Sequence, residues 1–314
     1  MTAKIIAPGP QTTLQGGSRV GYRHQGVPWA GAADPVSLSI ANRLVGNPAD
    51  TLAIETTFGG LRLSFDAPAA IGMAGAVADA ALDEQPVSFH ETVHVRAGQT
   101  LTILPPSAGL RSYVAIAGGW TGADILGSKS TYMPASLGGF EGRSLRAGDV
   151  LGWRQAARVI ELVSTPKDLR PSMQLSWTLR ATLSAEHAWL KEESQRRLFS
   201  QSFTIARDSS RMGVRLEGAP LNFSVEKALP SAPVFPGILQ CPPSGAPILL
   251  LADGQTTGGY PRICHVIRAD RHLMGQLRPG DRLRLLLRSE DSARRDYERK
   301  DALLNTWLDA SLLF

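Results

Sequence analysis

Along most of the chain, short apolar runs alternate with turn residues. Between residues 52 and 154, runs of Val, Ile, Leu and Thr are separated by Gly, Pro and Asp, a pattern that predicts a series of short strands. Residues 4–7 predict a first strand, strand-like sequence resumes at Phe203, and it ends with the alternating segment RLRLLLR at 282–288. The sequence therefore predicts a mainly β protein with a few helices.

Three segments have the features of helices. Asp34 and Pro35 suit an N-cap and a first helical position, apolar residues follow at helical spacing, and a Gly-Asn-Pro sequence at 46–48 ends the segment. A second helix is predicted for residues 185–198. The C-terminal segment 289–314 begins with Ser-Glu-Asp and carries apolar residues on one side, which predicts an amphipathic C-terminal helix.

A repeated turn phrase suggests an internal duplication. Each copy is a glycine turn before a strand-like run, and the last copy hints that the second half repeats the architecture of the first. A length of 314 residues favours about two domains, and a loose polar stretch with two prolines places the boundary near residue 165. We therefore predict domains at 1–165 and 166–288, followed by the helix at 289–314. The repeated phrases are RAGQTL (96–101), RAGDVL (146–151) and RPGDRL (278–283).

Composition narrows the class of protein. Hydrophobic residues make up 43% and charged residues 19% of the chain, as in a soluble globular protein. The net charge of +5 comes from interspersed arginines, and no basic stretch interleaves with aromatic residues, so nucleic acid is not an expected partner. No apolar run reaches membrane-spanning length, and we expect a cytoplasmic protein. Cys241 and Cys264 are expected to be reduced core thiols rather than a disulfide.

A zinc-peptidase pattern, HETVH, occurs at residues 90–94. In such enzymes the motif works on a helix, where residues four apart share one face and reach one metal. Here Pro86 precedes the motif and β-branched residues surround it. On a strand the two His would lie about 13 Å apart, so we predict no metal site.

The segment DGQTTGGYPR at 253–262 is the strongest candidate for a functional loop. It follows the apolar run PILLLA at 247–252, which predicts a buried strand. Two consecutive glycines can adopt positive φ and leave backbone N–H groups uncovered, so the loop could face a polar ligand or the backbone of a partner. An ordinary tight hairpin is the alternative.

Other glycine-rich polar segments lie at 127–131, 138–143 and 208–213. Arg143 and Arg211 within them are candidate anion holders, because a guanidinium binds a carboxylate or phosphate through two hydrogen bonds. A structural salt bridge is the alternative for each. No P-loop, no GxSxG elbow and no Rossmann glycine fingerprint is present.

Several of these phrases together resemble one known family. Its most specific landmarks are QTTGGYP and the helix that runs from Asp-Pro to Ala-Asn-Arg-Leu-Val-Gly-Asn. The chain resembles the allophanate hydrolase subunit 2 family, also called the biotin-dependent carboxyltransferase or KipA-like family, which includes the C subunit of 5-oxoprolinase. The landmarks are GVPWAGAADPVSLSIANRLVGN (26–47), AGG and LGSKST within 117–131, GGFEGR (138–143), DSSRMGVRLEG (208–218), PGILQCPPSGAPI (236–248) and DGQTTGGYPRI (253–263).

The resemblance implies a fold and a set of partners. The fold is two pseudo-duplicated cyclophilin-like β-barrel subdomains. The expected partners are the A subunit of such a complex and its KipI-like B subunit. Together with the C subunit, they open the lactam of 5-oxoproline to glutamate in an ATP-dependent hydrolase reaction. The chain departs from the usual family pattern at Ser231-Ala232-Pro233, where Ser-Glu-Gly is common, and at residues 179–183, where Leu-Pro-Gly-Pro-Gln is common.

Two other functions remain open under this resemblance. One is carboxyl transfer from biotin, as in urea carboxylase; this sequence has no Met-Lys carrier phrase, so biotin would sit on a separate carrier. The other is a non-catalytic KipA-like role as regulatory partner of a KipI-like protein.

The resemblance also implies site residues for an amide or lactam substrate. Asp34 has two candidate roles, a helix cap and a ligand contact. The expected cofactor is ATP with Mg²⁺ in the complex. The expected catalytic residues are Asp34, Arg143, Arg211 and Asp253, and the expected substrate-binding residues are Ser128, Gln240, Gln255, Thr256, Thr257, Gly258, Gly259 and Tyr260.

Overall fold

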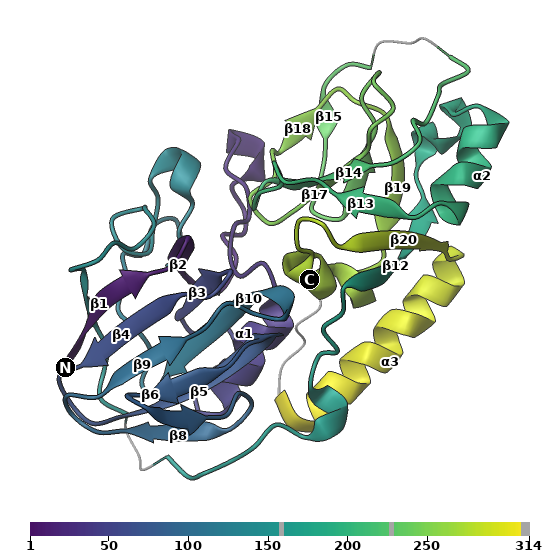
Figure 1. The fold of residues 1–314 in the computed structure, drawn as a ribbon. Coiled ribbons are helices and arrows are strands. Elements are labelled where there is room, and N and C mark those ends of the chain that lie inside the picture. The colour runs from purple at the N-terminus through teal and green to yellow at the C-terminus, as the bar shows by residue number, and fades with distance from the viewer. Residues whose placement is uncertain (157–159, 226–228, 309–314) are drawn as a thin grey trace. The chain divides into compact units, whose positions relative to one another are not determined.

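The computed structural model describes residues 1–156, 160–225 and 229–308 (Figure 1). The chain forms two compact units. Of the described residues, unit 1 comprises Met1–Arg19, Ala30–Met173 and residues 303–308, and unit 2 comprises Val20–Trp29 and Gln174–Ala302. The sequence-based domain boundaries after residues 165 and 288 stay a prediction. Nothing in the sequence places segment 20–29 with the second unit.

Unit 1 is built from two antiparallel sheets. One has the strand order β11-β1-β4-β9-β6-β7 and the other β2-β3-β10-β5-β8. The strands are β1 (Thr2–Pro8), β2 (Gln11–Gln15), β3 (Ala53–Thr57), β4 (Leu61–Phe65), β5 (Ala69–Val77), β6 (Ala80–Leu82), β7 (Gln85–Val87), β8 (Thr92–Val95), β9 (Thr100–Ile103), β10 (Ala108–Ile116) and β11 (Val150–Gly152).

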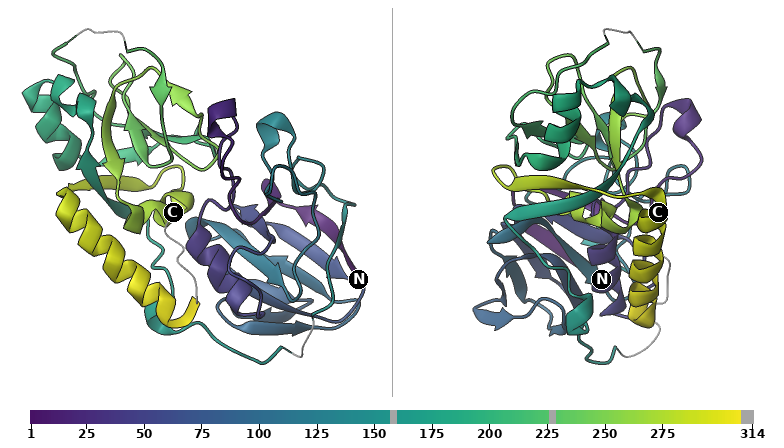
Figure 2. Two further views of the ribbon diagram at one scale, coloured as in Figure 1. Left: turned by 180° about the vertical axis from the view of Figure 1, so that it is seen from behind. Right: turned by 90° about the vertical axis from the view of Figure 1, so that its right-hand side faces the viewer.

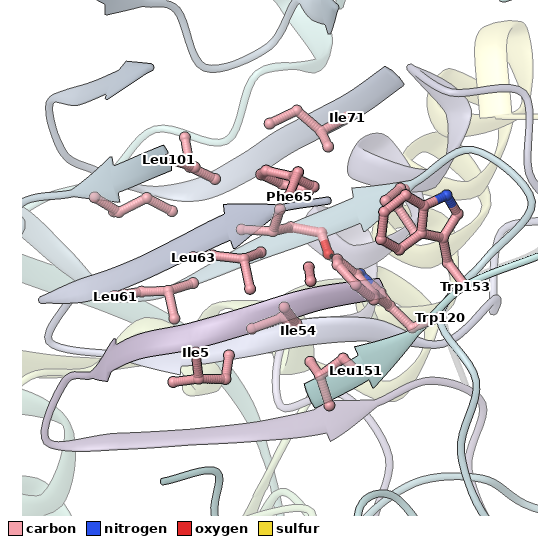
Figure 3. Close-up of a cluster of buried hydrophobic side chains, with 14 of the residues drawn as sticks. Ile5, Ile54, Leu61, Leu63, Phe65, Ile71, Leu101, Trp120, Leu151 and Trp153 are labelled. Carbon is pink, nitrogen blue, oxygen red and sulfur yellow. Dashed lines mark hydrogen bonds between the residues drawn. The ribbon is translucent and has the colours of Figure 1, made fainter. Parts of the chain in front are cut away.

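Both sheets of unit 1 contribute to one hydrophobic core (Figure 3). Strand β4 shows how the sequence directs this, because Leu61, Leu63 and Phe65 are buried and the residues between them are not. Phe65 packs against the edge of Trp153 at 6.1 Å, and Trp153 packs against Trp120 at 5.8 Å between ring centroids. Such edge-to-face contacts are favourable beyond the area they bury.

Helix α1 (Pro35–Arg43) begins where the sequence predicts, with Asp34 as its N-cap and Pro35 at its start. The helix lies along the sheet that contains β5 (Figure 2). Gly72 of β5 allows this close approach, because a Cβ atom there would overlap the carbonyl of Ala41. The 3₁₀ turns of this unit are η2 (Met133–Ala135) and η3 (Lys167–Leu169).

Unit 2 contains a closed seven-stranded barrel with the order β12-β19-β16-β17-β14-β13-β20. All of its pairings are antiparallel except that between β12 and β20. The predicted mainly β fold is confirmed. The strands are β12 (Ser176–Leu183), β13 (Phe203–Ile205), β14 (Gly213–Glu217), β16 (Ile238–Gln240), β17 (Ile248–Leu250), β19 (Arg262–Val266) and β20 (Arg282–Leu287), with a separate pair β15 (Ala232–Pro233) and β18 (Thr257–Gly258).

The single helix predicted for residues 185–198 is wrong. The segment forms a 3₁₀ turn, η4 (Ala185–Trp189), and then a helix, α2 (Glu192–Ser200). Leu190 between them is extended and buried, and the backbone N–H of Lys191 donates to the carbonyl of Asn222 at 2.9 Å. A tertiary hydrogen bond thus replaces the helical one at this position.

The predicted C-terminal helix is confirmed as α3 (Glu290–Leu308). The predicted residues 309–314 lie outside the described residues. Two further 3₁₀ elements belong to unit 2, η1 (Arg23–Gln25) and η5 (Arg268–Gln276). Within the described part of the chain, no helix is long and apolar enough to span a membrane.

The three repeated phrases adopt one turn geometry. The glycine of each has a positive φ of 85–95°: Gly98, Gly148 and Gly280. In each, the residue after the glycine accepts a hydrogen bond at its side chain from the backbone N–H three residues earlier: Arg96 to Gln99 at 2.8 Å, Arg146 to Asp149 at 2.7 Å, and Arg278 to Asp281 at 3.3 Å. Strands β9, β11 and β20 then follow, as predicted.

The two cysteines are free and buried, as expected for core thiols. Burial raises the pKa of the Cys241 thiol to about 12. Burial and the nearby Cys241 also raise the pKa of Cys264. Both thiols are therefore protonated at neutral pH, and protonated thiols are weak nucleophiles.

The HETVH motif lies on a turn and the strand that follows it, not on a helix; His90 is in the turn, with a positive φ of 65°. His94 is in β8 and pairs with Ala70 of β5, and the backbone N–H of His90 donates to the carbonyl of Met73 at 2.8 Å. The helical geometry that the zinc motif requires is therefore missing here. Among the described residues, no group of three or more His, Cys, Asp and Glu side chains is placed to hold a metal ion.

The surroundings of His90 predict a pH dependence of stability. Burial first, and the charge of Arg170 second, lower the pKa of His90 to about 4. An unfolded histidine has a pKa of about 6.5, so between pH 6.5 and 4 the unfolded chain binds more protons than the folded one. Stability therefore falls as the pH is lowered through this window.

We expect His90→Gln to flatten part of this decline in melting temperature between pH 7 and 4.5. The decline should not vanish, because the half-buried His265 and the buried His272 also have lowered pKa values, of about 4 and about 3. His94→Gln is the matched control, since His94 is the exposed histidine of the same motif, on β8, and it should keep the wild-type profile. A His90→Gln profile parallel to wild type would contradict the assignment.

Candidate functional site

The predicted site residues fall into two groups, one in each unit. Unit 1 holds Asp34, Ser128 and Arg143. The residues in unit 2 are Arg211, Gln240, Asp253, Gln255, Thr256, Thr257, Gly258, Gly259 and Tyr260.

Asp34 serves as a helix cap. Its Oδ1 accepts a hydrogen bond from the Ser37 backbone N–H at 3.0 Å and its Oδ2 from the Ser37 hydroxyl at 2.6 Å. Its side chain is buried. The capping role predicted as one of two alternatives for Asp34 is therefore present in the structure.

A buried polar network adjoins this cap. The Tyr113 hydroxyl accepts from the Asp34 backbone N–H at 2.8 Å and donates to Glu55 Oε2 at 2.7 Å. Arg111 lies 3.5 Å from the other oxygen of Glu55. Burial, followed by the charges of Glu55 and Asp34, raises the pKa of Tyr113, so its hydroxyl keeps the proton that it donates. The network fixes the start of α1 to β3 and β10.

Arg143 is held by acidic neighbours. Its Nη1 and Nη2 donate to Asp149 at 2.7 and 3.0 Å, and its Nε donates to Glu141 at 2.9 Å. The guanidinium also lies 4.9 Å from the centre of the Phe140 ring. The hydrogen bond to Asp149, the largest cause, raises the pKa of Arg143 further above its ordinary value. The salt-bridge alternative predicted for Arg143 is therefore the geometry observed.

Ser128 lies at the wall of a polar pocket of about 370 Å³ in unit 1. Two cationic and two anionic side chains line it, Lys129, Arg154, Asp50 and Asp124. Its walls also include several glycines, whose missing side chains leave peptide groups accessible. Paired charges and peptide groups suit a small polar molecule that carries both a carboxylate and an N–H group.

Local hydrogen bonds fix the Ser128 side chain. Its hydroxyl donates to the carbonyl of Gly17 at 2.8 Å and accepts from the Ser130 backbone N–H at 3.1 Å. The Ser130 hydroxyl donates to the same carbonyl at 2.9 Å. The nearby Arg19, which the sequence did not single out, donates to the carbonyls of Ile125 and Ser130, both at 2.9 Å. These bonds make a rigid rim for the pocket.

A buried ion pair anchors the loop at residues 253–262 of unit 2. The Arg211 guanidinium donates from Nε and Nη2 to the two oxygens of Asp253, both at 2.8 Å. The backbone N–H of Asp253 also donates to the carbonyl of Arg211 at 3.0 Å. Both side chains are almost fully buried, at 4% and 2% exposure. The anion that Arg211 binds is thus the carboxylate of Asp253, as in the salt-bridge alternative. The pair fixes the position at which the loop leaves β17.

The middle of the loop rests on the buried side chain of Gln240. Gln255 Nε2 donates to Gln240 Oε1 at 3.0 Å, and Gln240 Nε2 donates weakly to the carbonyl of Tyr260 at 3.4 Å. A Cβ atom at Gly258 would come within 2.6 Å of Gln240 Nε2. A side chain at position 258 would therefore displace the Gln240 amide from its place beneath the loop.

The two glycines do not adopt the positive φ that the sequence allowed, since neither is among the glycines with positive φ. Gly258 instead lies in β18, which pairs with β15 through Ala232 and Pro233. The backbone N–H of Val234 also donates to the carbonyl of Thr256 at 3.0 Å. The loop is therefore joined to a distant segment and is not a simple local hairpin.

The outer side of the loop is open. Gln255, Thr257, Gly259 and Tyr260 are exposed, with Tyr260 at 47%, whereas Thr256 is buried. An amide, two hydroxyls and a glycine backbone thus face outwards from a base fixed by hydrogen bonds. Such a rigid base with outward polar groups is what a specific binding surface requires.

An arginine that sequence reasoning missed lies beside this loop. Arg23 donates from Nη2 to the carbonyl of Val234 and to that of Gln255, the latter at 3.4 Å. Its guanidinium lies 5.0 Å from the ring of Trp29 and 5.1 Å from that of Phe235. Burial lowers its pKa. The only signal in the sequence was an arginine and a tryptophan within the glycine-rich passage before α1.

Comparison with known proteins places this geometry in a family. Residues 25–287 match the family described as carboxyltransferase domain, subdomain A and B. The chain belongs to this carboxyltransferase family. The match covers parts of both units and includes the loop at 253–262, Gln240 and Arg211.

Relatives of this carboxyltransferase-family chain fall into two groups. The chain is 36% identical to the 5-oxoprolinase C subunit of Escherichia coli, over 94% of this chain and 95% of that protein. It is 32% identical to urea amidolyase of Saccharomyces cerevisiae, over 99% of this chain and 18% of that protein.

A solved structure agrees with the second group. The urea amidolyase of K. lactis superposes with a TM-score of 0.91 at 28% identity, and the match covers 100% of this chain. The chain spans only 20% of that solved protein. The shared fold is therefore one module of a much longer polypeptide in urea amidolyase.

The buried pair in this carboxyltransferase-family chain predicts a large effect of substitution. Asp253→Ala leaves the Arg211 charge buried without its fork partner, and we expect a loss of about 3–5 kcal/mol in the free energy of unfolding. The matched control is Asp208→Ala, which removes the exposed pair with Arg215 and should cost about 1 kcal/mol or less. Urea denaturation measures both.

A second variant separates the charge from the packing. Arg211→Met combined with Asp253→Leu removes both charges, and it should recover much of the stability lost by Asp253→Ala. Equal losses for Asp253→Ala and Asp208→Ala would contradict the anchoring role of the pair.

Proposed function

We propose that this chain is a component like the C subunit of an ATP-dependent 5-oxoprolinase. Together with an A subunit plus a KipI-like B subunit, it would open the lactam of 5-oxoproline to glutamate in the cytoplasm. The observation that carries the proposal is the 36% identity to the C subunit of 5-oxoprolinase along nearly all of both chains. The similar match to the Haemophilus influenzae protein of the same name supports it.

Within this proposal, the exposed side of the loop at 253–262 contacts the substrate. A lactam offers one N–H donor and one carbonyl acceptor, which the hydroxyls of Thr257 and Tyr260 and the peptide groups of Gly258 and Gly259 can match. Thr256 is buried beneath them. We propose that Gln240 and Gln255 position this surface and that Arg211 and Asp253 act as positioning residues.

In this proposal the residues of unit 1 stabilise local structure or provide a second binding place. Asp34 and Arg143 hold local structure through Ser37 and Asp149. The polar pocket beside Ser128 provides a second place for a small carboxylate-bearing molecule, where Lys129 and Arg154 would meet the carboxylate.

ATP would supply the activation of the lactam oxygen, which makes ring opening feasible. The described residues of this chain provide no group of three carboxylate, His or Cys side chains for Mg²⁺. We therefore assign the nucleotide and its metal to the complex as a whole.

The alternative function is carboxyl transfer from biotin, with the biotin on a separate carrier. The family description and the match to urea amidolyase favour it. The identity to urea amidolyase is lower, at 30–32%, and the matched part is 18% of each of those proteins. Avidin blotting of the complex purified from cells distinguishes the two, because only carboxyl transfer requires a biotinylated partner.

The direct test is reconstitution with the cognate A and B subunits and measurement of glutamate formed from 5-oxoproline. We expect glutamate formation that requires both ATP and this chain. Thr257→Ala should lower kcat/KM about tenfold, the equivalent of one hydrogen bond of about 1.4 kcal/mol. Thr178→Ala is the matched control, an exposed threonine on the barrel strand β12, and it should leave the rate unchanged.

Two results would overturn the proposal. One is the absence of ATP-dependent glutamate formation in a complex that assembles stoichiometrically. The other is equal activity of the Thr257→Ala and wild-type complexes, which would remove the loop from the substrate site even if the complex is active.

A further inference from the structure

Another pocket, which lies in unit 2, has three arginines in its lining. It has a volume of about 310 Å³ and none of the loop residues at 253–262 lines it. We call it the arginine pocket. It is lined by Thr182, His265, Ile267, Arg268, Arg271, Glu290, Ala293, Arg294 and Tyr297.

One face of helix α3 forms a wall of the arginine pocket. Glu290, Ala293, Arg294 and Tyr297 are spaced at i, i+3, i+4 and i+7, the spacing of residues on a single helical face. The small side chain of Ala293 leaves room between the longer ones. The sequence therefore presents an arginine and an aromatic ring together at this wall.

Two further arginines face the same space from η5. The Arg268 guanidinium lies 5.1 Å from the centre of the Tyr297 ring, so the ring orients it. Arg271 donates from Nη2 to His265 Nε2 at 3.0 Å. Gly237 leaves space for this pair, because a Cβ atom there would lie 3.1 Å from the His265 ring and 3.3 Å from Arg271 Nε.

The neighbouring carboxylates of Asp270 and Asp296 bind arginines that do not line the pocket. Asp270 accepts two hydrogen bonds from the Arg180 guanidinium, at 2.9 and 2.6 Å. Asp296 lies 2.9 Å from Arg180 and 3.1 Å from Arg288. Of the described residues that line the pocket, Glu290 is the one acidic residue. Three guanidinium groups thus share the pocket with a single carboxylate.

The charges in the pocket repel one another. Burial first, and the charge of Arg268 second, lower the pKa of Arg271 to about 10. Burial and the charge of Arg271 lower the pKa of His265 to about 4, so His265 is neutral at pH 7 and accepts the hydrogen bond from Arg271. A bound anion would relieve the repulsion between Arg268 and Arg271.

We propose that the arginine pocket binds a phosphate dianion, either free or as the phosphoryl group of a small molecule. Guanidinium groups bind tetrahedral oxyanions through paired, charge-assisted hydrogen bonds, and Arg268, Arg271 and Arg294 supply them from two elements. Thr182, whose hydroxyl donates to the carbonyl of His265 at 3.5 Å, also lies at the wall. The volume suits a small ligand. This site goes beyond the proposed function and does not depend on it.

The test is isothermal titration of the full chain with inorganic phosphate at pH 7.5, with the ionic strength matched by sodium chloride. We expect saturable binding at one site per chain. Arg268→Gln combined with Arg294→Gln should weaken it at least about tenfold, because each lost charge-assisted hydrogen bond is worth that much or more. Both side chains are exposed, so the fold should persist.

Two further variants make the test specific. Arg299→Gln is the matched control, since it removes an exposed arginine of α3 that does not line the pocket, and its affinity should stay within about twofold of wild type. Ala293→Glu places a negative charge on the pocket wall with the arginines intact, and phosphate binding should be lost. Thermal melting without phosphate reports whether each variant is folded.

Three outcomes would overturn the proposal. The first is that phosphate does not bind saturably to the wild-type chain. The second is that the folded double variant, with Arg268→Gln and Arg294→Gln, binds phosphate with wild-type affinity. The third is that Arg299→Gln loses as much phosphate affinity as the double variant does. Titration with ADP separates the two sources of the ligand. If ADP binds more tightly than phosphate and with the same sensitivity to the variants, the ligand is a phosphoryl compound; if only phosphate binds, it is the free ion.

Discussion

The arrangement of the candidate site depends on one buried ion pair, Arg211 with Asp253. Two charges removed from water must be paired with good geometry, because an uncompensated charge in the interior costs several kcal/mol. The pair therefore permits only a narrow range of positions for the chain at residue 253. The short strand pairing of β18 with β15 and the Gln240–Gln255 amide contact both lie beyond this fixed point in the loop.

The pair also bears on which arginines of this protein can bind an external anion. A guanidinium that already binds a carboxylate through one pair of N–H groups cannot offer the same pair to a substrate carboxylate. Among the described residues, forks of this kind hold arginines in the pairs Arg143–Asp149, Arg180–Asp270, Arg211–Asp253 and Arg262–Glu186. Arginines outside these forks, such as those of the arginine pocket and Arg154 beside Ser128, are the better candidates for anion binding.

Much of the local structure could be predicted from the sequence because its signals are local. The start of α1 at Asp34 and Pro35, strand β17 and strand β20 follow from capping residues and apolar patterns. The break at Leu190 could not be predicted, because it depends on a hydrogen bond to Asn222, which is distant in the sequence. The role of Arg211 was open for the same reason, since Asp253 lies 42 residues away.

The candidate site shows the same limit. The sequence indicated which segment is polar and rich in glycine, but it did not show that Gly258 lies against the Gln240 amide or that its φ is not positive. Arg23 belongs to this surface only through tertiary contacts with Val234 and Phe235. These contacts cannot be predicted from residue type and spacing, because they join segments of unit 2 that are distant in the sequence.

The most direct measurement of the central claim, that the loop at 253–262 is a substrate-facing surface on a fixed base, is hydrogen exchange of its backbone amides in the assembled complex. We expect added 5-oxoproline to slow exchange at residues 257–260. Exchange at the N–H of Asp253, which already donates to Arg211, should stay slow throughout. Unchanged exchange at residues 257–260 in a complex that binds 5-oxoproline would contradict the claim.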